Sequence, residues 1–336
     1  MTARQTLYRP ADTTELSWRH ATVTDIDAIL DCARAMDGSD HPHFVTTREE
    51  IAVEFDHSYV DQARDSLLAI DRQNRVVAWG MTVLSPGQET LVRAFLFGGI
   101  RPDSRGRGIG RMLFEWQQER GLQQLASSDK TLPGWLLTFA EESAAGAAHL
   151  YDRFGFRVGR YFLQLTRDVR RPIDDRSLDD ELRLLPFGQD WSEATMLARN
   201  NAFRDHWGSQ PSTEEQWKEF VASLVFRPDL SFIAVGTNAS GADEVAGLVL
   251  TSVNEEDWVP AGFSSGYIDL VGVAREWRNR GIASALLSRT LRAIADAGLE
   301  RAVLDVDSES PTGALGLYTA VGFSESSRSM SFIREF

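Results

Sequence analysis

Two segments rich in glycine and arginine are the first candidates for chemistry in this chain. They are Arg105–Gly110 (RGRGIG) and Arg278–Ala283 (RNRGIA), and each follows an apolar run and opens a helical pattern. Backbone N–H groups at the start of a helix are unpaired and the helix dipole is positive there, while glycine lets an anion approach the backbone. The flanking arginines can add charge-assisted contacts. The two segments therefore predict two loops that bind a phosphate-bearing ligand.

Three other motif interpretations fail on the residues. Gly106, Gly108 and Gly110 lack the third glycine at the dinucleotide-binding spacing, and the chain has no Gly-Lys-Ser/Thr for a P-loop. The segment Gly262–Gly266 (GFSSG) matches Gly-x-Ser-x-Gly, but a nucleophile elbow needs a strand before it and a helix after it. Here an apolar strand pattern follows it instead, so we reject a hydrolase.

The loops belong to a repeat that covers most of the chain. The segment Ser104–Trp116 recurs as Trp277–Arg289, and Leu150–Phe156 (LYDRFGF) recurs as Leu317–Phe323 (LYTAVGF). Offsets of 173 residues between the loop glycines (281 − 108) and 167 between the tyrosines (318 − 151) indicate a duplicated domain. The charged, Pro-containing stretch at 168–181 suits a linker, so we predict domains at 15–171 and 181–336.

Both halves show the same order of elements. In the first half, a strand at Leu16–His20 precedes a helix, and Thr47 with Glu50 forms a capping box for a second helix. A hairpin turning at Asp71–Asn74 leads to a long apolar strand, the glycine loop and a helix that we expect to stop at Gly121. An antiparallel sheet followed by a strand–helix–strand crossover predicts an α+β fold.

The paired motifs resemble those of the GCN5-related N-acetyltransferases, the GNAT superfamily. The resemblance rests on Arg-x-x-Gly-x-Gly/Ala after a strand with a later Leu-Tyr-x-x-x-Gly-Phe, both found twice. It implies two GNAT-like domains, each a mixed, mostly antiparallel sheet flanked by helices, with acetyl-CoA as co-substrate. The second half is most similar to actinobacterial tandem acetyltransferases, the group that includes mycothiol synthase.

The resemblance implies a set of cofactor-binding residues in each half. In the second half they are Leu270, Val271, Gly272, Val273, Arg278, Asn279, Arg280, Gly281, Ile282, Ala283, Ser284 and Ser310. In the first half they are Gly98, Gly99, Ile100, Arg105, Gly106, Arg107, Gly108, Ile109, Gly110 and Arg111. The family often carries an asparagine where this chain has Ser310 and Ser143, and a serine hydroxyl can still bond the pantetheine arm.

The resemblance also implies a general acid, Tyr318 in the second half and Tyr151 in the first. Transfer of an acyl group from a thioester to an amine needs a proton for the departing thiolate, and a tyrosine hydroxyl supplies one. For the base we select Asp269, a carboxylate inside an apolar strand, unless strand alternation turns it outward. Asp205 or Glu255 is the alternative base. The matching strand of the first half has no carboxylate, so we expect catalysis in the second half.

The acceptor pocket is expected at Asp205, His206 and Trp207, since an aromatic face and a carboxylate suit an amine. His41 and His43 lie in the equivalent region of the first half, but no third ligand is near, so we expect no metal. The function that follows is N-acetylation of a primary amine of a small molecule. A mycothiol synthase is one alternative, and a non-catalytic tandem acyl-CoA-binding or scaffold protein is the other.

Composition restricts the partners further. The chain of 336 residues has 35 Lys and Arg against 49 Asp and Glu, a formal charge of −14, which disfavours nucleic acid and anionic membranes. A single cysteine, Cys32, excludes an internal disulfide framework. Because we find no signal-peptide core and no spanning apolar run, we expect a cytoplasmic protein. These patterns do not specify the acceptor or the oligomeric state.

Overall fold

The chain folds into two compact units. The computed structural model describes residues 8–310 and 312–336. One unit comprises the chain up to Arg160 together with Ser329–Phe336, and the other comprises Tyr161–Arg328. These units differ from the ranges 15–171 and 181–336 because each unit includes a strand segment from the other half of the sequence. We call them the N-terminal and C-terminal units.

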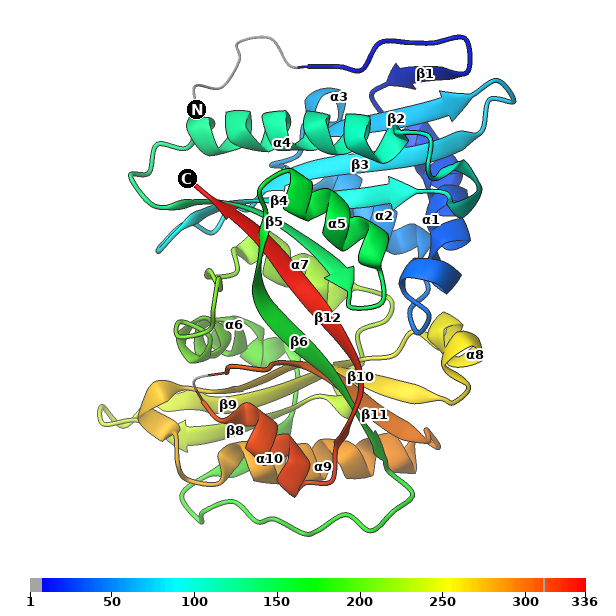
Figure 1. Cartoon of the computed structure of the whole chain (residues 1–336). Helices are drawn as coiled ribbons and strands as arrows, with labels where there is room; N and C mark the ends of the chain where they lie inside the picture. The colour runs from blue at the N-terminus through cyan, green and yellow to red at the C-terminus, as the bar shows by residue number, and fades with distance from the viewer. Residues whose placement is uncertain (1–7, 311) are drawn as a thin grey trace. The chain divides into compact units, whose positions relative to one another are not determined.

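The N-terminal unit is a sheet with helices on both faces (Figure 1). Its own strands are β1 (Leu16–Arg19), β2 (Ser66–Asp71), β3 (Val76–Leu84), β4 (Val92–Ile100) and β5 (Gly134–Glu141). Its helices are α1 (Ile26–Asp40), α2 (Arg48–Asp56), α3 (Gln62–Asp65), α4 (Ile109–Ser127) and α5 (Ala145–Arg153). The strands follow the order β1-β2-β3-β4-β5, antiparallel except for the parallel pair β4 and β5.

The C-terminal unit repeats this arrangement. Its strands are β7 (Arg183–Pro186), β8 (Phe232–Thr237), β9 (Asp243–Ser252), β10 (Ser265–Val273) and β11 (Arg301–Asp307). Its helices are α6 (Ser192–Ala202), α7 (Glu214–Ala222), α8 (Trp258–Ala261), α9 (Ile282–Asp296) and α10 (Ala314–Ala320). Again only β10 and β11 pair in parallel. Within the described residues, no helix is both long and apolar enough to cross a bilayer.

Each unit buries one apolar layer on either face of its sheet. In the C-terminal unit α9 packs through Ile282, Leu286 and Ile294 on one face, while α6 and α7 pack Ala198 and Trp217 on the other. The apolar residues of α9 recur every three to four positions, so one helix face is buried in the core. This packing sets the start of α9 beside the end of β10.

Two long strands complete the sheets by exchange. The C-terminal strand β12 (Ser324–Glu335, red in Figure 1) pairs antiparallel with β5 over Ser329–Glu335. Strand β6 (Arg157–Asp168) pairs antiparallel with β11 over Phe162–Asp168. The last strand of the first half therefore belongs mainly to the C-terminal unit, and the last strand of the second half to the N-terminal unit.

Two local predictions from the sequence are confirmed, and a third is wrong. The capping box of Thr47 and Glu50 forms at α2, and β2 and β3 form the expected hairpin. The expected stop at Gly121 is wrong, because α4 continues to Ser127. A Cβ atom at Gly121 would lie 2.6 Å from Cδ2 of Leu136 in β5. That glycine permits close packing of the helix on the sheet and does not end the helix.

Candidate active site

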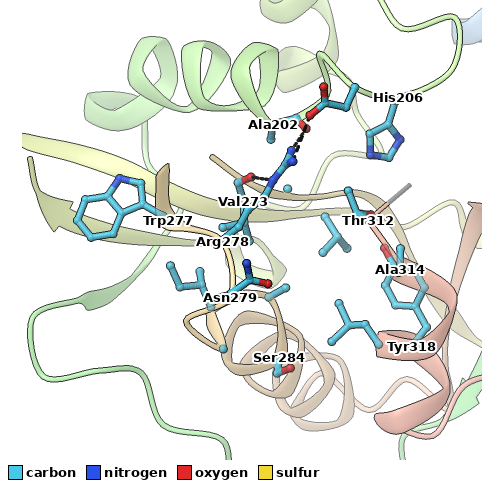
Figure 2. Close-up of a pocket in the computed structure, with 17 residues that line it drawn as sticks. Ala202, His206, Val273, Trp277, Arg278, Asn279, Ser284, Thr312, Ala314 and Tyr318 are labelled. Carbon is cyan, nitrogen blue, oxygen red and sulfur yellow. Dashed lines mark hydrogen bonds and ion pairs between the residues drawn. The ribbon is translucent and has the colours of Figure 1, made fainter. Parts of the chain in front are cut away.

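A cavity of about 540 Å³ lies in the C-terminal unit where β10 separates from β11. The two strands pair only over Ser265–Tyr267 within the described chain, and the rest of β10 pairs with β9. Figure 2 shows the cavity with Tyr318 of α10 on one side and Arg278 and Asn279 of the glycine loop on the other. The end of β10 at 271–273 and the start of α9 at 282–284 complete its wall.

The two glycine loops share an unusual backbone conformation. Gly281 has φ 73° and Asn279 has φ 64°, and their counterparts Gly108 and Gly106 have φ 82° and 76°. Asparagine is one of the few residues that tolerates this left-handed region, which explains how it replaces a glycine here. Gly281 is the N-cap of α9, and no side chain of the described chain caps that helix end. The first N–H groups of α9 therefore remain available to an anion in the cavity.

Three of the loop arginines are already engaged by the protein. Arg278 donates from Nη2 to the main-chain oxygen of Ala202 at 2.9 Å and from Nη1 to Asp205 at 3.1 Å. In the N-terminal unit Arg105 donates to the main-chain oxygen of Ile100 at 3.0 Å and to Asp40 at 2.6 Å. Arg280 forms ion pairs with acidic residues at 179 and 181, at 2.7 and 3.0 Å. In the C-terminal loop the groups still offered to a phosphate are chiefly backbone N–H groups, whereas in the N-terminal loop Arg111 also lines the cavity.

Tyr318 has a buried ring and a hydroxyl group at the cavity. The side chain lines the cavity, its ring centroid lies 5.9 Å from that of Phe323, and the residue is 7% exposed. Among the described residues no hydrogen-bond partner reaches its hydroxyl group. Burial raises the pKa of Tyr318, so at neutral pH the hydroxyl keeps its proton. It can therefore donate that proton to a group in the cavity.

The N-terminal unit holds a corresponding cavity of about 670 Å³. Its lining includes 98–100 at the end of β4, most of the loop at 105–111, Ser143 and Tyr151, but Arg107 is outside it. Tyr151 packs against Phe114 at 4.9 Å and Phe332 at 5.2 Å between ring centroids. Burial raises the pKa of Tyr151, and a hydrogen bond with Thr138 offsets part of the rise. Unlike β10, β4 carries no carboxylate.

Comparisons with known proteins agree with this geometry. Residues 192–323 match the family model "Acetyltransferase (GNAT) family", and residues 63–158 match "Acetyltransferase (GNAT) domain". A mycothiol acetyltransferase of Parafrankia sp. (strain EAN1pec) is 30% identical over 342 residues, covering 96% of this chain and 98% of that protein. The chain belongs to the GNAT acetyltransferase family. The prediction of a tandem GNAT acyltransferase is thereby confirmed.

Further matches differ in how much they cover. The mycothiol acetyltransferase of Renibacterium salmoninarum is 28% identical over 67% of this chain, and the match spans 62% of that protein's length. A GCN5-related N-acetyltransferase from Sphaerobacter thermophilus superposes with a TM-score of 0.70 at 23% identity, covering 95% of both chains. A tandem GNAT protein from the clavulanic acid biosynthesis pathway reaches 0.69 at 13% identity, covering 96% of this chain and 98% of that one. The two structures confirm the predicted α+β fold.

Asp269 of the GNAT sheet occupies a β-bulge. The register of β10 on β9 shifts between Ile268 and Leu270, so Asp269 is the extra residue. Its Oδ2 atom is buried and has no hydrogen-bond partner among the described residues, while a hydrogen bond from Ser252 reaches the carboxylate. Burial raises the pKa of Asp269 to about 7. The residue does not line the cavity itself, but Val271, two residues further along β10, does.

A second acidic side chain near Asp269 was not predicted. The Tyr267 hydroxyl donates to Oδ2 of Asp305 in β11 at 2.8 Å. Partial desolvation is the main cause that raises the pKa of Tyr267, which is half-buried, and of Asp305, which is exposed. The charge of Asp269 adds to the rise at Tyr267. Alternation places Tyr267 and Asp269 on one face of β10 up to the bulge. Polar residues two positions apart in each apolar strand, Tyr267 and Asp269 in β10 and Asp305 and Asp307 in β11, are the pattern that could have indicated them.

Only two of the three expected acceptor residues line the cavity. Asp205 and His206 line it, whereas Trp207 does not. The Asp205 carboxylate forms ion pairs with Arg275 and Arg278. Partial desolvation acts to raise its pKa, but these contacts hold the pKa below the usual value. Burial lowers the pKa of His206, whose ring lies 4.6 Å from that of Phe203. The carboxylate expected to receive the amine is therefore already neutralised by protein groups.

Three expected cofactor residues of the C-terminal unit lie outside the cavity lining, namely Leu270, Arg280 and Ser310. Leu270 packs instead with the apolar cluster under α6 and α7. The Ser310 hydroxyl lies 2.9 Å from that of Thr312, which does line the cavity. Thr312 was not predicted, and its hydroxyl is a further polar group available to a ligand there.

Proposed function

We propose that the chain transfers the acetyl group of acetyl-CoA to a primary amine of a small molecule, in the C-terminal unit. One observation carries this proposal. The Tyr318 hydroxyl, which has no hydrogen-bond partner in the described chain, lies at the same cavity as the start of α9, where no described side chain caps the helix. The N–H groups of α9 bind the pyrophosphate of the donor, and Gly281 leaves the space for it. The thioester then lies between the end of β10 and Tyr318.

The reaction needs two proton movements. The amine loses a proton through a water molecule to Asp269, and its nitrogen forms a bond to the thioester carbonyl carbon. As the tetrahedral intermediate collapses, the carbon–sulfur bond breaks and the leaving thiolate takes the proton of Tyr318. The products are an amide and CoA, and the proton on Asp269 returns to Tyr318 through solvent.

Two differences between the units favour the C-terminal one. The pairing of β4 with β3 continues in register from Ala94 to Ile100, so β4 has no counterpart of the Asp269 bulge. The Tyr151 hydroxyl interacts with Thr138, whereas that of Tyr318 has no described partner. The N-terminal cavity keeps the loop and the space for a CoA molecule, and we propose that it binds acetyl-CoA without transferring the acetyl group.

The relatives suggest a narrower acceptor. Several proteins that match most of this chain are named mycothiol acetyltransferases, among them the Parafrankia protein matched over 98% of its length. We therefore propose the amine of a mycothiol precursor as the first acceptor to assay.

The proposed function is tested with purified full-length protein and a panel of amines, including mycothiol precursors and aminoglycosides, by measuring free CoA. Tyr318→Phe removes one oxygen atom, so we expect kcat to fall by about 10²–10⁴-fold with little change in acetyl-CoA affinity. Tyr151→Phe is the matched variant of the other unit and should keep kcat. Binding of acetyl-CoA without transfer to any amine would indicate the non-catalytic alternative.

A further inference from the structure

A buried arginine holds the end of the helix that carries Tyr318. Arg167 of β6 is 6% exposed and donates three hydrogen bonds, each to a main-chain oxygen. Nε reaches the oxygen of Val321 at 2.6 Å, while Nη1 and Nη2 reach those of Asp168 and Pro172 at 2.7 Å. The carboxylate of Asp168 is paired with Arg170. The guanidinium of Arg167 is therefore engaged by backbone carbonyl groups.

The contact falls on a defined position of α10. Val321 is the C-cap of this helix, three residues after Tyr318, where carbonyl groups lack helical partners. The next residue, Gly322, has φ 91°, and a Cβ atom there would lie 3.3 Å from Nε of Arg167. The glycine of the Leu-Tyr-x-x-x-Gly-Phe motif thus provides both the left-handed turn and the room for the guanidinium.

The N-terminal unit contains the same contact. Nη1 of Arg334 in β12 donates to the main-chain oxygen of Phe154 at 2.8 Å and to Oε1 of Gln118 at 2.7 Å. Phe154 is the C-cap of α5, three residues after Tyr151. Both arginines, both C-caps and both tyrosines are 167 residues from their counterparts, as in 334 − 167 and 318 − 151.

We propose that Arg167 is a positioning residue for acetyl transfer, which holds the carboxyl end of α10 and so sets the place of the Tyr318 hydroxyl. The inference rests on the proposed function of Tyr318. That hydroxyl has no described partner to orient it, and α10 has only seven residues, too few to be stable by itself. The position of the hydroxyl is then set by the packing of the Tyr318 ring beside Phe323 and by the contacts that anchor the helix.

The exchange of strands makes this anchoring reciprocal. Arg167 comes from the strand that ends the first half of the sequence and anchors the tyrosine helix of the second half. Arg334 comes from the strand that ends the second half and anchors the tyrosine helix of the first. Each half of the chain therefore contributes to the geometry of the other half's site.

A kinetic double-mutant cycle tests the proposal. Arg167→Met keeps most of the apolar length of the side chain and removes the donors. We expect it to lower kcat by about ten- to a hundredfold with the KM of acetyl-CoA nearly unchanged, because the acid is misplaced while the loop is intact. In the Tyr318→Phe background the same change should cost nothing further. An equal loss in both backgrounds would show that Arg167 acts on the fold in general and would overturn the proposal.

Arg334→Met is the matched control, since it removes the same kind of contact from α5, outside the proposed reaction. We expect it to keep kcat while lowering the free energy of unfolding to a similar degree. Arg167→Lys retains a charge and a donor and should recover part of the lost kcat. If Arg167→Met does not fold, Arg167→Lys replaces it in the cycle.

A second readout does not depend on activity. In protein labelled with 3-fluorotyrosine, the resonances of positions 318 and 151 are assigned from Tyr318→Phe and Tyr151→Phe. Arg167→Met should shift the resonance of position 318 and not that of 151, and Arg334→Met should do the reverse. If Tyr318→Phe keeps full kcat, Tyr318 is not the general acid and the proposed function fails. The resonance of position 318 still shows whether Arg167 positions the tyrosine ring. An unmoved resonance of position 318 would overturn the proposal by itself.

Discussion

Arg278 and Asp205 form an ion pair, with Nη1 3.1 Å from the carboxylate, across a sequence separation of 73 residues. The arginine also donates to the main-chain oxygen of Val273 at 3.3 Å, at the end of β10. Arg105 and Asp40 form the equivalent pair in the N-terminal unit at 2.6 Å. The first arginine of the glycine loop therefore ties the loop to the last residue of α1 in the N-terminal unit and to the segment just after α6 in the C-terminal unit.

The first prediction concerns this pair. Asp205→Asn should raise the KM of acetyl-CoA by about two- to fivefold with little change in kcat, because a partly exposed pair contributes up to ~1 kcal/mol to holding the loop. The control is Asp190→Asn, which makes the same charge change at an exposed carboxylate that forms no ion pair within the described chain. An equal effect of both variants on KM would attribute it to net charge. Steady-state kinetics measures the difference.

Gly281→Val should weaken acetyl-CoA binding. The Cβ atom would meet no protein atom within 4 Å, so it would project into open space where the phosphate must approach. The left-handed backbone also costs a non-glycine residue about 1–2 kcal/mol of stability. Gly262→Val is the control, since Gly262 has φ 77° and open space but lies outside the cavity. Both variants should lose stability, and only Gly281→Val should raise the KM of acetyl-CoA.

The rate of transfer should depend on the ionisation of Asp269. With the pKa of Asp269 raised to about 7, its carboxylate forms only as the pH rises through neutrality. We expect kcat/KM at fixed amine ionisation to rise across this range. Asp269→Asn should remove that rise and lower the rate by about 10²–10⁴-fold. A pH profile that keeps its inflection in the variant would place the base elsewhere, with Asp205 and Glu255 the next residues to replace.

The same carboxylate should make stability depend on pH. Its pKa is about 7 in the folded chain and close to 3.8 when unfolded, so between these values the folded state holds the extra proton. Stability therefore falls as the pH rises through this interval. The free energy of unfolding of Asp269→Asn minus that of the parent should therefore be larger at pH 8 than at pH 4. Urea unfolding at the two pH values gives this difference, and a difference that does not change with pH would contradict the assigned burial.

Local sequence patterns predicted much of this protein. The repeated loop and tyrosine motifs indicated the tandem GNAT organisation, and the structure places Gly281 and Tyr318 at one cavity. These predictions succeeded because each motif is determined by residues that are adjacent in the sequence. One motif is a glycine of left-handed conformation just before a helix, and the other is a tyrosine within a short helix. The same holds for the capping box at Thr47, whose partner is three residues away.

Only the tertiary structure determined the remaining features. The bulge at Asp269 exists only relative to the register of β9, and the partner of Arg278 lies 73 residues away. Such pairings depend on which distant segments meet in space. The exchange of β6 and β12 is the clearest case, because duplication makes the two strands equivalent and each could in principle complete either sheet. The tertiary structure determines which sheet each strand joins, and therefore which arginine anchors which tyrosine helix.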